Sequence, residues 1–378
     1  MNISLCFYYR HELLSVNDPD VLKTISEDNE YFTKEIESAY ADLAILNGRG
    51  LVTTATRDPD WQLGHKLIMN AFSARAMKAY HYKMGESISE LCEIIESFAK
   101  NGEDFDVSRW FIALALESIG KIGFNYDFDL LKDPNAPRHP FTVALAYVQA
   151  MIMKRVSTMS WLKWYQTTTN VRFHRDLQTL RGTVDDVLKD RREHPHTKDD
   201  AADLLDFMIN AESKEGEKLN DSLIRDNIIT FLSAGHNTTS AFLSWTILEL
   251  CKHPEVVENI KQEIANCGVK AGEVPTPEQV KECKYLDLVI KESLRIHPPI
   301  TGILKYCKKD TIVKASDGNE YEIKSGQLLQ TNIYALHHNP KVWEDPEVFN
   351  PDRFAGDQEY HPNAWMAFSD GPRACIGR

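Results

Sequence analysis

A cysteine flanked by glycines and an arginine is the residue of this sequence best suited to bind a metal. Cys375 lies in FSDGPRACIGR, residues 368–378, with Arg373 two positions before it. Gly371 and Gly377 allow positive φ or a close backbone approach on both sides of the sulfur, which suits a tight loop presenting amide N–H groups. A thiolate held by N–H donors beside a cation can be an iron ligand. Taken alone, a cysteine among small residues is most often a buried apolar side chain.

In each of two predicted helices, a pair of side chains shares one helix face. Glu292 and Arg295 in KESLR, residues 291–295, are three positions apart. Residues at this spacing are neighbours on a helix, so the pair alone predicts a surface ion pair worth about 0.2–0.5 kcal/mol. Trp61 and His65 are four positions apart, and a core tryptophan beside a surface histidine is the simplest interpretation of that pair.

A polar segment interrupts the longest helix that the sequence predicts. This helix covers about residues 221–251 and is apolar almost all round in its middle, so it is expected to run through the core. SAGHNTTS, residues 233–240, lies at that middle. Serine and threonine can bond back to the preceding turn and bend a helix. The segment therefore predicts either a kink without chemistry or a groove for a small ligand, with Thr238 as its hydroxyl.

The composition is that of a folded globular protein. At 378 residues, with 43% hydrophobic and 26% charged residues, the chain can bury a large core. The net charge of −13 argues against a nucleic-acid-binding protein whose whole surface is basic. The sequence contains no run of about 18 apolar residues, so it predicts no membrane-spanning helix. Its opening residues are a poor secretory signal. The seven cysteines are scattered without zinc-type spacing, which predicts free thiols in a reducing compartment.

Most of the chain is predicted to be helical, with a smaller β-rich part near the C-terminus. The helical patterns cover about residues 61–100, 104–128, 139–165, 171–192, 221–251, 256–266 and 277–296. After them, TIVKASDGNEYEIK, residues 311–324, predicts a β-hairpin around Asp317 and Gly318. Since no repeat or flexible linker is evident, residues 1–378 are predicted to form a single domain.

Five motifs occur together in the order and approximate spacing of the cytochrome P-450 family. They are WxxxH at 61–65, AGxxTT at 234–239, ExxR at 292–295, PxRF at 351–354 and FxxGxRxCxG at 368–377. The chain resembles this family from about residue 15 to its end, and the cysteine motif is the most specific part. The resemblance implies the cytochrome P-450 fold, mainly α with a smaller β-rich part, in which a long central helix crosses the haem.

By this resemblance, Cys375 is the thiolate ligand of the iron in haem b, with Phe368 packed near the sulfur and Gly371 and Gly377 in the same cofactor-binding loop. A thiolate ligand favours O–O cleavage, which produces an oxidant able to attack a C–H bond. The side chains expected to donate to the haem propionates are Trp61, His65 and Arg373. The side chains expected to form a buried cluster on the same side of the haem as the thiolate are Glu292, Arg295 and Arg353.

On the oxygen side, the resemblance implies that Ala234 and Thr238 face the iron-bound oxygen, and that Thr238 helps to deliver protons. The residue before this threonine is usually acidic in the family, but here it is Asn237. An amide can orient water but cannot relay a proton by ionising. The implied function is a monooxygenase that inserts one oxygen atom from O2 into an apolar substrate. A haem-thiolate isomerase or dehydratase, which does not need that proton relay, is the alternative.

The resemblance also implies the substrate class and the partners. The residues expected to line an apolar pocket above the haem are Val52, Ile300, Gly302 and Ile303. The chain looks most like bacterial and fungal fatty-acid hydroxylases that are often fused to their reductase. NADPH and flavin are expected to act only through that flavoprotein reductase, separate or fused, and no nucleic acid is expected. The expected location is intracellular, in the cytoplasm or at the endoplasmic reticulum surface, with no anchor visible in this chain and membrane association of a full-length protein left open.

Both ends of the chain are short by comparison with the family. The cysteine loop usually leads into a long helix under the haem, but here the sequence stops at Arg378. The residues before Trp61 are expected to leave too little room for the usual first helix and first strands. The chain is therefore expected to be an incomplete cytochrome P-450 domain. A truncated product without haem or catalytic activity is a further alternative.

Overall fold

The structure of this chain is a computed structural model. It describes residues 3–8, 11–34, 36–37, 39–132, 139–156, 158, 162–163, 170–196, 202–270, 272–356 and 360–378. Two compact units are formed, named here the sheet unit (Met1–Glu35 and Ala241–Arg378) and the helical unit (Ile36–Ser240). The single-domain prediction stays a prediction. A search of the described residues finds no helix of the length and hydropathy needed to cross a membrane.

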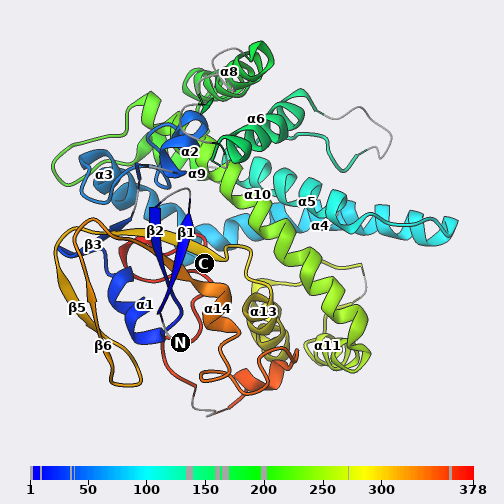
Figure 1. The fold of residues 1–378 in the computed structure, drawn as a ribbon. Helices are drawn as coiled ribbons and strands as arrows, with labels where there is room; N and C mark the ends of the chain where they lie inside the picture. Colours follow the sequence, from blue (N-terminus) through cyan, green and yellow to red (C-terminus); the bar gives the residue numbers. More distant parts are fainter. Residues whose placement is uncertain are drawn as a thin grey trace. The chain divides into compact units, whose positions relative to one another are not determined.

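The described part of the helical unit is built mainly from helices (Figure 1). Its helices are α2 (Ala39–Asn47), α3 (Pro59–Ile68), η1 (Met69–Phe72), α4 (Ala74–Asn101), α5 (Val107–Phe124), α6 (Pro140–Val156), α8 (Val171–Glu193), α9 (Leu204–Asn210) and the first part of α10 (Asp221–Lys252). Helix α4 packs along α5, and α6 packs along α8. The helical stretch predicted over residues 61–100 is interrupted at η1, after which the Ser73 hydroxyl accepts the N–H of Ala76 and begins α4.

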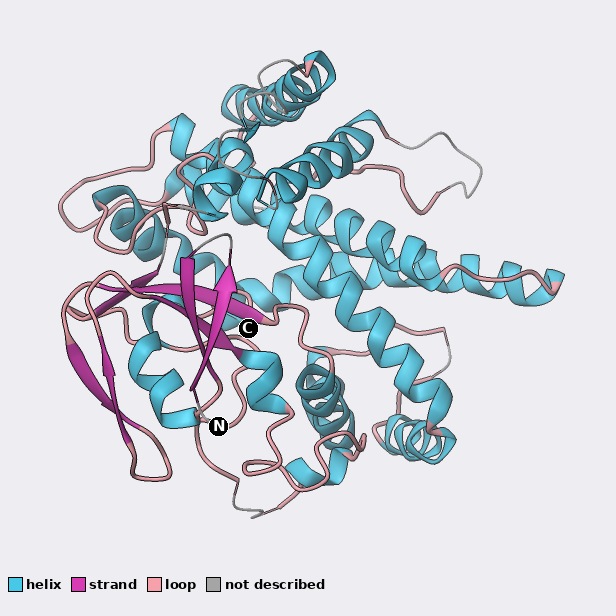
Figure 2. Cartoon of the chain, in the orientation of Figure 1, coloured by secondary structure: helices cyan, strands magenta, loops and turns pink. Residues whose placement is uncertain are grey.

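The sheet unit contains a mixed five-stranded sheet, magenta in Figure 2. In spatial order its strands are β1 (Ile3–Tyr8), β2 (His11–Val16), β7 (Leu328–Asn332), β4 (Gly302–Cys307) and β3 (Phe32–Lys34). Strands β2 and β7 run parallel, and the other neighbours run antiparallel. The remaining helices of this unit are α1 (Pro19–Ser26), the end of α10, α11 (Pro254–Asn266), α12 (Pro277–Glu282), α13 (Lys284–Ile296), α14 (Ile333–His337), η2 (Pro351–Phe354) and η3 (Gly371–Arg373).

One hydrophobic core of the sheet unit lies between α1, the sheet and a hairpin. Val21, Leu22 and Ile25 of α1 are fully buried against residues such as Leu329 of β7. Asp18 begins α1 by accepting the N–H groups of Asp20 and Val21. The predicted hairpin is confirmed as β5 (Thr311–Lys314) paired with β6 (Glu320–Ile323), and its turn contains a positive φ of 84° at Gly318. The predicted fold class, mainly helical with a smaller β-rich part, is also confirmed.

The N-terminal strands were not predicted from the sequence. Strands β1, β2 and β3 and helix α1 all lie within the first 34 residues, so the expectation that this region lacks room for a first helix and strands is wrong. These strands pair with residues about 300 positions away, such as Val16 with Thr331 and Phe32 with Cys307. Pairing at that separation is decided by tertiary contacts rather than by a local pattern.

The long helix α10 differs in burial along its length. The predicted span of 221–251 is confirmed by the observed Asp221–Lys252. Residues of the first half, such as Ile224, Ile228 and Leu232, are buried in the helical unit. In the second half, Trp245 is 45% exposed and Leu248 is 41% exposed. The expectation that the whole helix runs through the core is therefore correct only for its first half.

Candidate active site

A buried carboxylate organises the end of α13 in the sheet unit. Glu292 is 0% exposed. It accepts two hydrogen bonds from Arg295, at 2.7 Å from Nε and 2.9 Å from Nη2. Arg353 of η2 donates to the same carboxylate from Nε at 3.0 Å, and the backbone N–H of Asn350 donates at 2.9 Å. These charged donors compensate the cost of burying the carboxylate.

The two arginines of this cluster also bind backbone carbonyls from later in the chain. Arg295 donates to the carbonyl of His337 at 2.7 Å. Arg353 donates to the carbonyls of Glu344 and Val348 at 3.0 and 3.1 Å. The structure thus brings together the three residues expected to form a cluster. The simpler interpretation of Glu292 and Arg295 as a surface ion pair is wrong, because both side chains are 0% exposed.

His337, the last residue of α14, was missed by the sequence analysis. Its side chain is fully buried, Nε2 accepts the backbone N–H of Met366 at 3.0 Å, and Nδ1 lies 3.1 Å from the carbonyl oxygen of Arg295. This pattern makes Nδ1 the donor and Nε2 the acceptor of a neutral imidazole. Burial, together with the charge of Arg295, lowers the pKa of His337 to about 3. Nothing in the local pattern distinguishes this histidine from an exposed one, so only packing reveals it.

The lowered pKa of His337 predicts a loss of stability in acid. Between pH 6.5 and about 3, the unfolded chain binds a proton at this residue and the folded chain does not. The free energy of unfolding should therefore fall by about 1.4 kcal/mol for each pH unit below 6.5 through this residue alone. Urea denaturation of the wild type and of His337→Leu across that range measures the difference in slope. His338→Gln, at the partly exposed neighbour, should keep the wild-type slope; an equal slope in His337→Leu would contradict the prediction.

The loop that carries Cys375, here called the cysteine loop and comprising residues 368–377, is tied to α13. The indole N–H of Trp365 donates to the carbonyl of Lys291 at 3.1 Å, and the Trp365 ring packs edge-on against Phe368 with centroids 5.9 Å apart. The backbone N–H of Cys375 donates to the carbonyl of Phe368 at 2.9 Å. The Cys375 side chain is exposed, so it is not a core-filling cysteine.

The two glycines of the cysteine loop behave differently. Gly371 has a φ of 72°, and a Cβ at this position would lie 2.3 Å from the carbonyl oxygen of Ser26. Only glycine fits at this position without strain, as the sequence predicts. Gly377 has no positive φ, and an added Cβ would meet no described atom within 4 Å. The same region is anchored to α1 by an ion pair of 2.5 Å between Lys23 and Asp370.

A buried lysine in β4 is the second residue that the sequence analysis missed. Lys305 is 1% exposed, and its Nζ has no hydrogen-bond partner among the described atoms. Burial lowers the pKa of Lys305 to about 8, opposed by Asp28 and reinforced by the nearby cation Arg373. The alternation of residues along β4 could have indicated this burial, because Lys305 lies on the same strand face as Ile303 and the buried Cys307. A buried ammonium beside a guanidinium is suited to an anionic ligand, such as a haem carboxylate.

The lowered pKa of Lys305 predicts that the protein without a bound anion becomes more stable as the pH rises. Between pH 8 and 10.5 the unfolded chain holds a proton at this residue that the folded chain has lost. The free energy of unfolding of the haem-free protein should rise by about 1.4 kcal/mol per pH unit over that range. Chemical denaturation should show this rise in the wild type and not in Lys305→Met.

In the haem-loaded protein, Lys305→Met should release haem faster to apomyoglobin than the wild type does. An unchanged rate of release would show that Lys305 does not contact the cofactor.

In the helical unit, the polar segment of α10 forms a hydrogen-bonded network with α6. The Thr238 hydroxyl donates to the carbonyl of Ala234 at 2.9 Å. Asn237 donates from Nδ2 to Oε1 of Gln149 at 3.3 Å, and Gln149 in turn donates from Nε2 to the Ser233 hydroxyl at 2.9 Å. Ala234 and Asn237 are exposed. The helix continues through this segment, so the structure places the predicted residues on an accessible part of α10 and adds Gln149 to them.

The loop before α3 is fixed to the start of α10 in the same unit. Asn227 accepts the N–H of Leu51 at 3.0 Å, and a Cβ at Gly50 would lie 2.1 Å from the Thr230 hydroxyl. The half-buried Val52 follows in this loop. The loop thereby sets the position of Val52 relative to the first half of α10.

Trp61 and His65 share a face of α3, as their spacing predicts. Their rings stack with centroids 4.7 Å apart. Trp61 is buried, and its indole N–H donates to the carbonyl of Leu51 at 3.2 Å, whereas His65 is half-buried. The donor that the sequence analysis assigned to a propionate is thus engaged with the backbone in this structure.

The remaining predicted pocket residues belong to the sheet unit. Ile300 is 45% exposed and Ile303 is half-buried at the start of β4. A Cβ at Gly302 would lie 2.8 Å from the Thr331 carbonyl oxygen and from Nε2 of Gln330, so this glycine permits the close pairing of β4 with β7.

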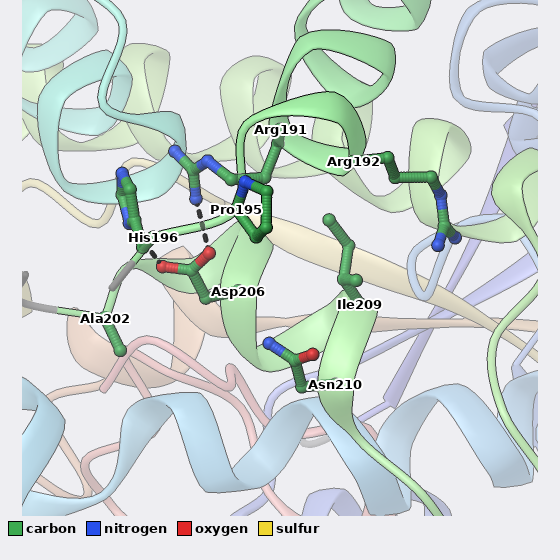
Figure 3. A pocket seen from close by; sticks show the side chains of 8 residues that line it. All are labelled: Arg191, Arg192, Pro195, His196, Ala202, Asp206, Ile209 and Asn210. Carbon is green, nitrogen blue, oxygen red and sulfur yellow. Dashed lines mark hydrogen bonds and ion pairs between the residues drawn. The ribbon is translucent and has the colours of Figure 1, made fainter. Parts of the chain in front are cut away.

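A separate hollow of about 370 Å³ lies at the end of α8 in the helical unit (Figure 3). Arg191 binds Asp203 at 2.7 and 2.8 Å and Asp206 at 2.6 Å, and His196 lies 2.7 Å from Asp206. The histidine and the two carboxylates are close enough together to resemble a metal site. However, the Arg191 guanidinium already neutralises the carboxylate oxygens that a cation would need. This cluster is therefore an ion-pair network that joins α8 to the start of α9.

Comparison with known proteins gives one consistent result. The cytochrome P450 family model matches residues 2–378. Bifunctional cytochrome P450/NADPH–P450 reductase 1 of Bacillus subtilis strain 168 is 34% identical over 354 residues, and the corresponding protein of Bacillus cereus strain ATCC 14579 is 35% identical over 358 residues. Each match covers 93% of this chain but 32% of the relative, so the chain spans about a third of their length. Human cytochrome P450 4F8 is 29% identical over 385 residues, covering 97% of this chain and 72% of that protein.

Proposed function

Because this chain belongs to the cytochrome P450 family, we propose that it supplies the haem-binding part of a monooxygenase that hydroxylates apolar chains such as fatty acids. The carrying observation is the exposed Cys375, in a loop closed by its own N–H on the carbonyl of Phe368. A free thiol presented to solvent from a fixed loop is available as a metal ligand, whereas a core-filling thiol is not.

The residues of the sheet unit fit haem in two respects. Cys375 offers the thiolate, and the buried Lys305 beside Arg373 offers cationic donors to a carboxylate. When bound, haem supplies an iron centre that activates dioxygen for insertion into a C–H bond. The cluster of Glu292, Arg295 and Arg353 is proposed to hold the cysteine loop in place through α13 and His337. The resemblance further supports Trp61 and His65 as proposed cofactor contacts.

On α10, the proposed role of Thr238 is to pass a proton from water at its hydroxyl oxygen. That hydroxyl now donates to the Ala234 carbonyl, so it must rotate away to donate outward. Asn237 orients water through its amide and cannot itself supply a proton. Its bond to Gln149 keeps the amide in a fixed direction. Val52, Ile300 and Ile303 are proposed substrate contacts, because apolar side chains exclude water and favour an apolar substrate.

The electron donor is proposed to be a flavoprotein that oxidises NADPH. The bacterial relatives are named as bifunctional proteins joining a cytochrome P450 to an NADPH–P450 reductase. Such a partner, separate or fused, supplies the two electrons that oxygen insertion consumes.

The test combines a spectrum with product analysis. The reduced, haem-loaded protein should show the long-wavelength Soret band of a thiolate-ligated haem with carbon monoxide. With a P450 reductase, NADPH and isotopically labelled dioxygen, saturated fatty acids should yield hydroxylated products that carry the label. Absence of the band from the reconstituted protein would overturn the proposal. A band together with rearrangement of a lipid hydroperoxide, without need of NADPH or dioxygen, would instead favour the isomerase or dehydratase.

A further inference from the structure

Two cysteine side chains meet at the junction of three helices in the sheet unit. Cys267 follows the last residue of α11, and Cys283 stands between α12 and α13. Their sulfur atoms are 3.7 Å apart. Since a disulfide bond is about 2.05 Å long, the sulfurs need to approach by less than about 2 Å to join.

The junction holds these two cysteines in place through several other contacts. Glu263 of α11 accepts the first N–H groups of α13, from Tyr285 at 2.6 Å and Leu286 at 2.9 Å. The side chain of Gln279 donates to the carbonyl of Cys267 at 3.2 Å, and the thiol of Cys283 donates to the carbonyl of Gln279 at 3.4 Å. These contacts hold the two chain segments that carry the cysteines beside each other.

The two thiols differ in access to solvent. Cys267 is half-buried and lines a surface depression of about 610 Å³, together with residues that include Asn259 and Glu282. Cys283 is 8% exposed. Burial, reinforced by the Cys267 thiol, raises the pKa of Cys283 to about 11. Cys267 is therefore the thiol that meets a dissolved oxidant first, and Cys283 is positioned to react second.

We propose that Cys267 and Cys283 form a reversible redox site that a hydroperoxide converts to a disulfide. The Cys267 sulfur attacks a peroxide oxygen, so that the O–O bond breaks, a sulfenic acid forms and water leaves. The Cys283 sulfur then attacks the Cys267 sulfur, its proton goes to the departing hydroxide, and a second water leaves. Two thiols lose two hydrogen atoms, and one peroxide is reduced to two waters. A thiol reductant reverses the reaction from the exposed side.

The bond would tie the end of α11 to the residue that precedes α13, the helix carrying Glu292 and Arg295. Cys267 and Cys283 are 16 positions apart, so the disulfide restricts the unfolded chain over that segment. The site lies outside the residues assigned to the proposed oxygenase chemistry, and it does not depend on bound haem.

The test uses the full 378-residue chain, reduced and then exposed to hydrogen peroxide. Alkylation under denaturing conditions should count two fewer thiols than the seven of the reduced chain. The intact mass should fall by about 2 Da, for the two hydrogen atoms removed. Peptide mapping should find Cys267 joined to Cys283, and dithiothreitol should restore both thiols.

Three variants make the test specific. Cys267→Ser, at the half-buried position, should keep the fold by circular dichroism and lose the cross-link, and Cys283→Ser should lose it as well. Cys92→Ser removes an exposed cysteine of the helical unit and should cross-link like the wild type. The proposal is overturned if both thiols stay open to alkylation after peroxide, if the cross-link joins another pair, or if Cys267→Ser still loses two thiols.

Discussion

Replacing Cys375 by alanine is expected to abolish the long-wavelength carbon monoxide band and reduce oxygen insertion to background. Cys375 is the only cysteine of the motif and the proposed thiolate ligand of the haem iron, so its loss would remove the ligand that favours O–O cleavage. Because the side chain is exposed, the free energy of unfolding of the haem-free protein should change by no more than about 0.5 kcal/mol. Difference spectra of the reconstituted protein, with urea denaturation of the haem-free form, measure both effects.

The matched control for this prediction is Cys251→Ala, which removes another exposed cysteine of the sheet unit. Its spectrum and activity should match those of the wild type. Retention of the thiolate-type band in Cys375→Ala would show that another group ligates the iron. Loss of the band in both variants would point to damage by cysteine replacement in general.

Replacing Arg295 by alanine is expected to cost about 3–5 kcal/mol of folding free energy, because it leaves the buried Glu292 without its main cation. The variant also frees the carbonyl of His337, to which Arg295 donates at 2.7 Å. Lysine should rescue little, since it cannot reproduce the paired donors from Nε and Nη2. Equilibrium urea denaturation followed by circular dichroism measures the change, and much of Arg295→Ala protein is expected to be insoluble in cells.

Helix α13 offers a control for Arg295 on its exposed face. Lys291 pairs with Asp287 at 2.8 Å, and these side chains are 39% and 57% exposed. Lys291→Ala keeps the backbone carbonyl that binds Trp365 and should change stability by less than about 1 kcal/mol. A loss in Arg295→Ala as small as that of Lys291→Ala would mean that the cluster around Glu292 does not hold the sheet unit together.

The sequence alone identified the local features that depend on near neighbours. The spacing of Glu292 and Arg295 placed them on one helix face, and Asp317 and Gly318 located the hairpin turn. The positive φ of Gly371 was likewise among the expectations. In each case the signal lies within a few residues, where helix periodicity or turn chemistry acts directly. The motifs themselves identified the family, which the family match over residues 2–378 confirms.

Tertiary structure decided the features that depend on distant residues. Only packing makes Glu292 and Arg295 a buried pair rather than a surface one, since exposure is set by neighbours from other elements. The pairing of β2 with β7, the burial of His337 and Lys305, and the hydrogen bond of Gln149 to Asn237 arise from contacts between segments far apart in the chain. The free energy of a charge or a strand edge depends on what surrounds it in space. Motif spacing could therefore identify the candidate site residues, but it could not identify the buried groups that distant segments bring beside them.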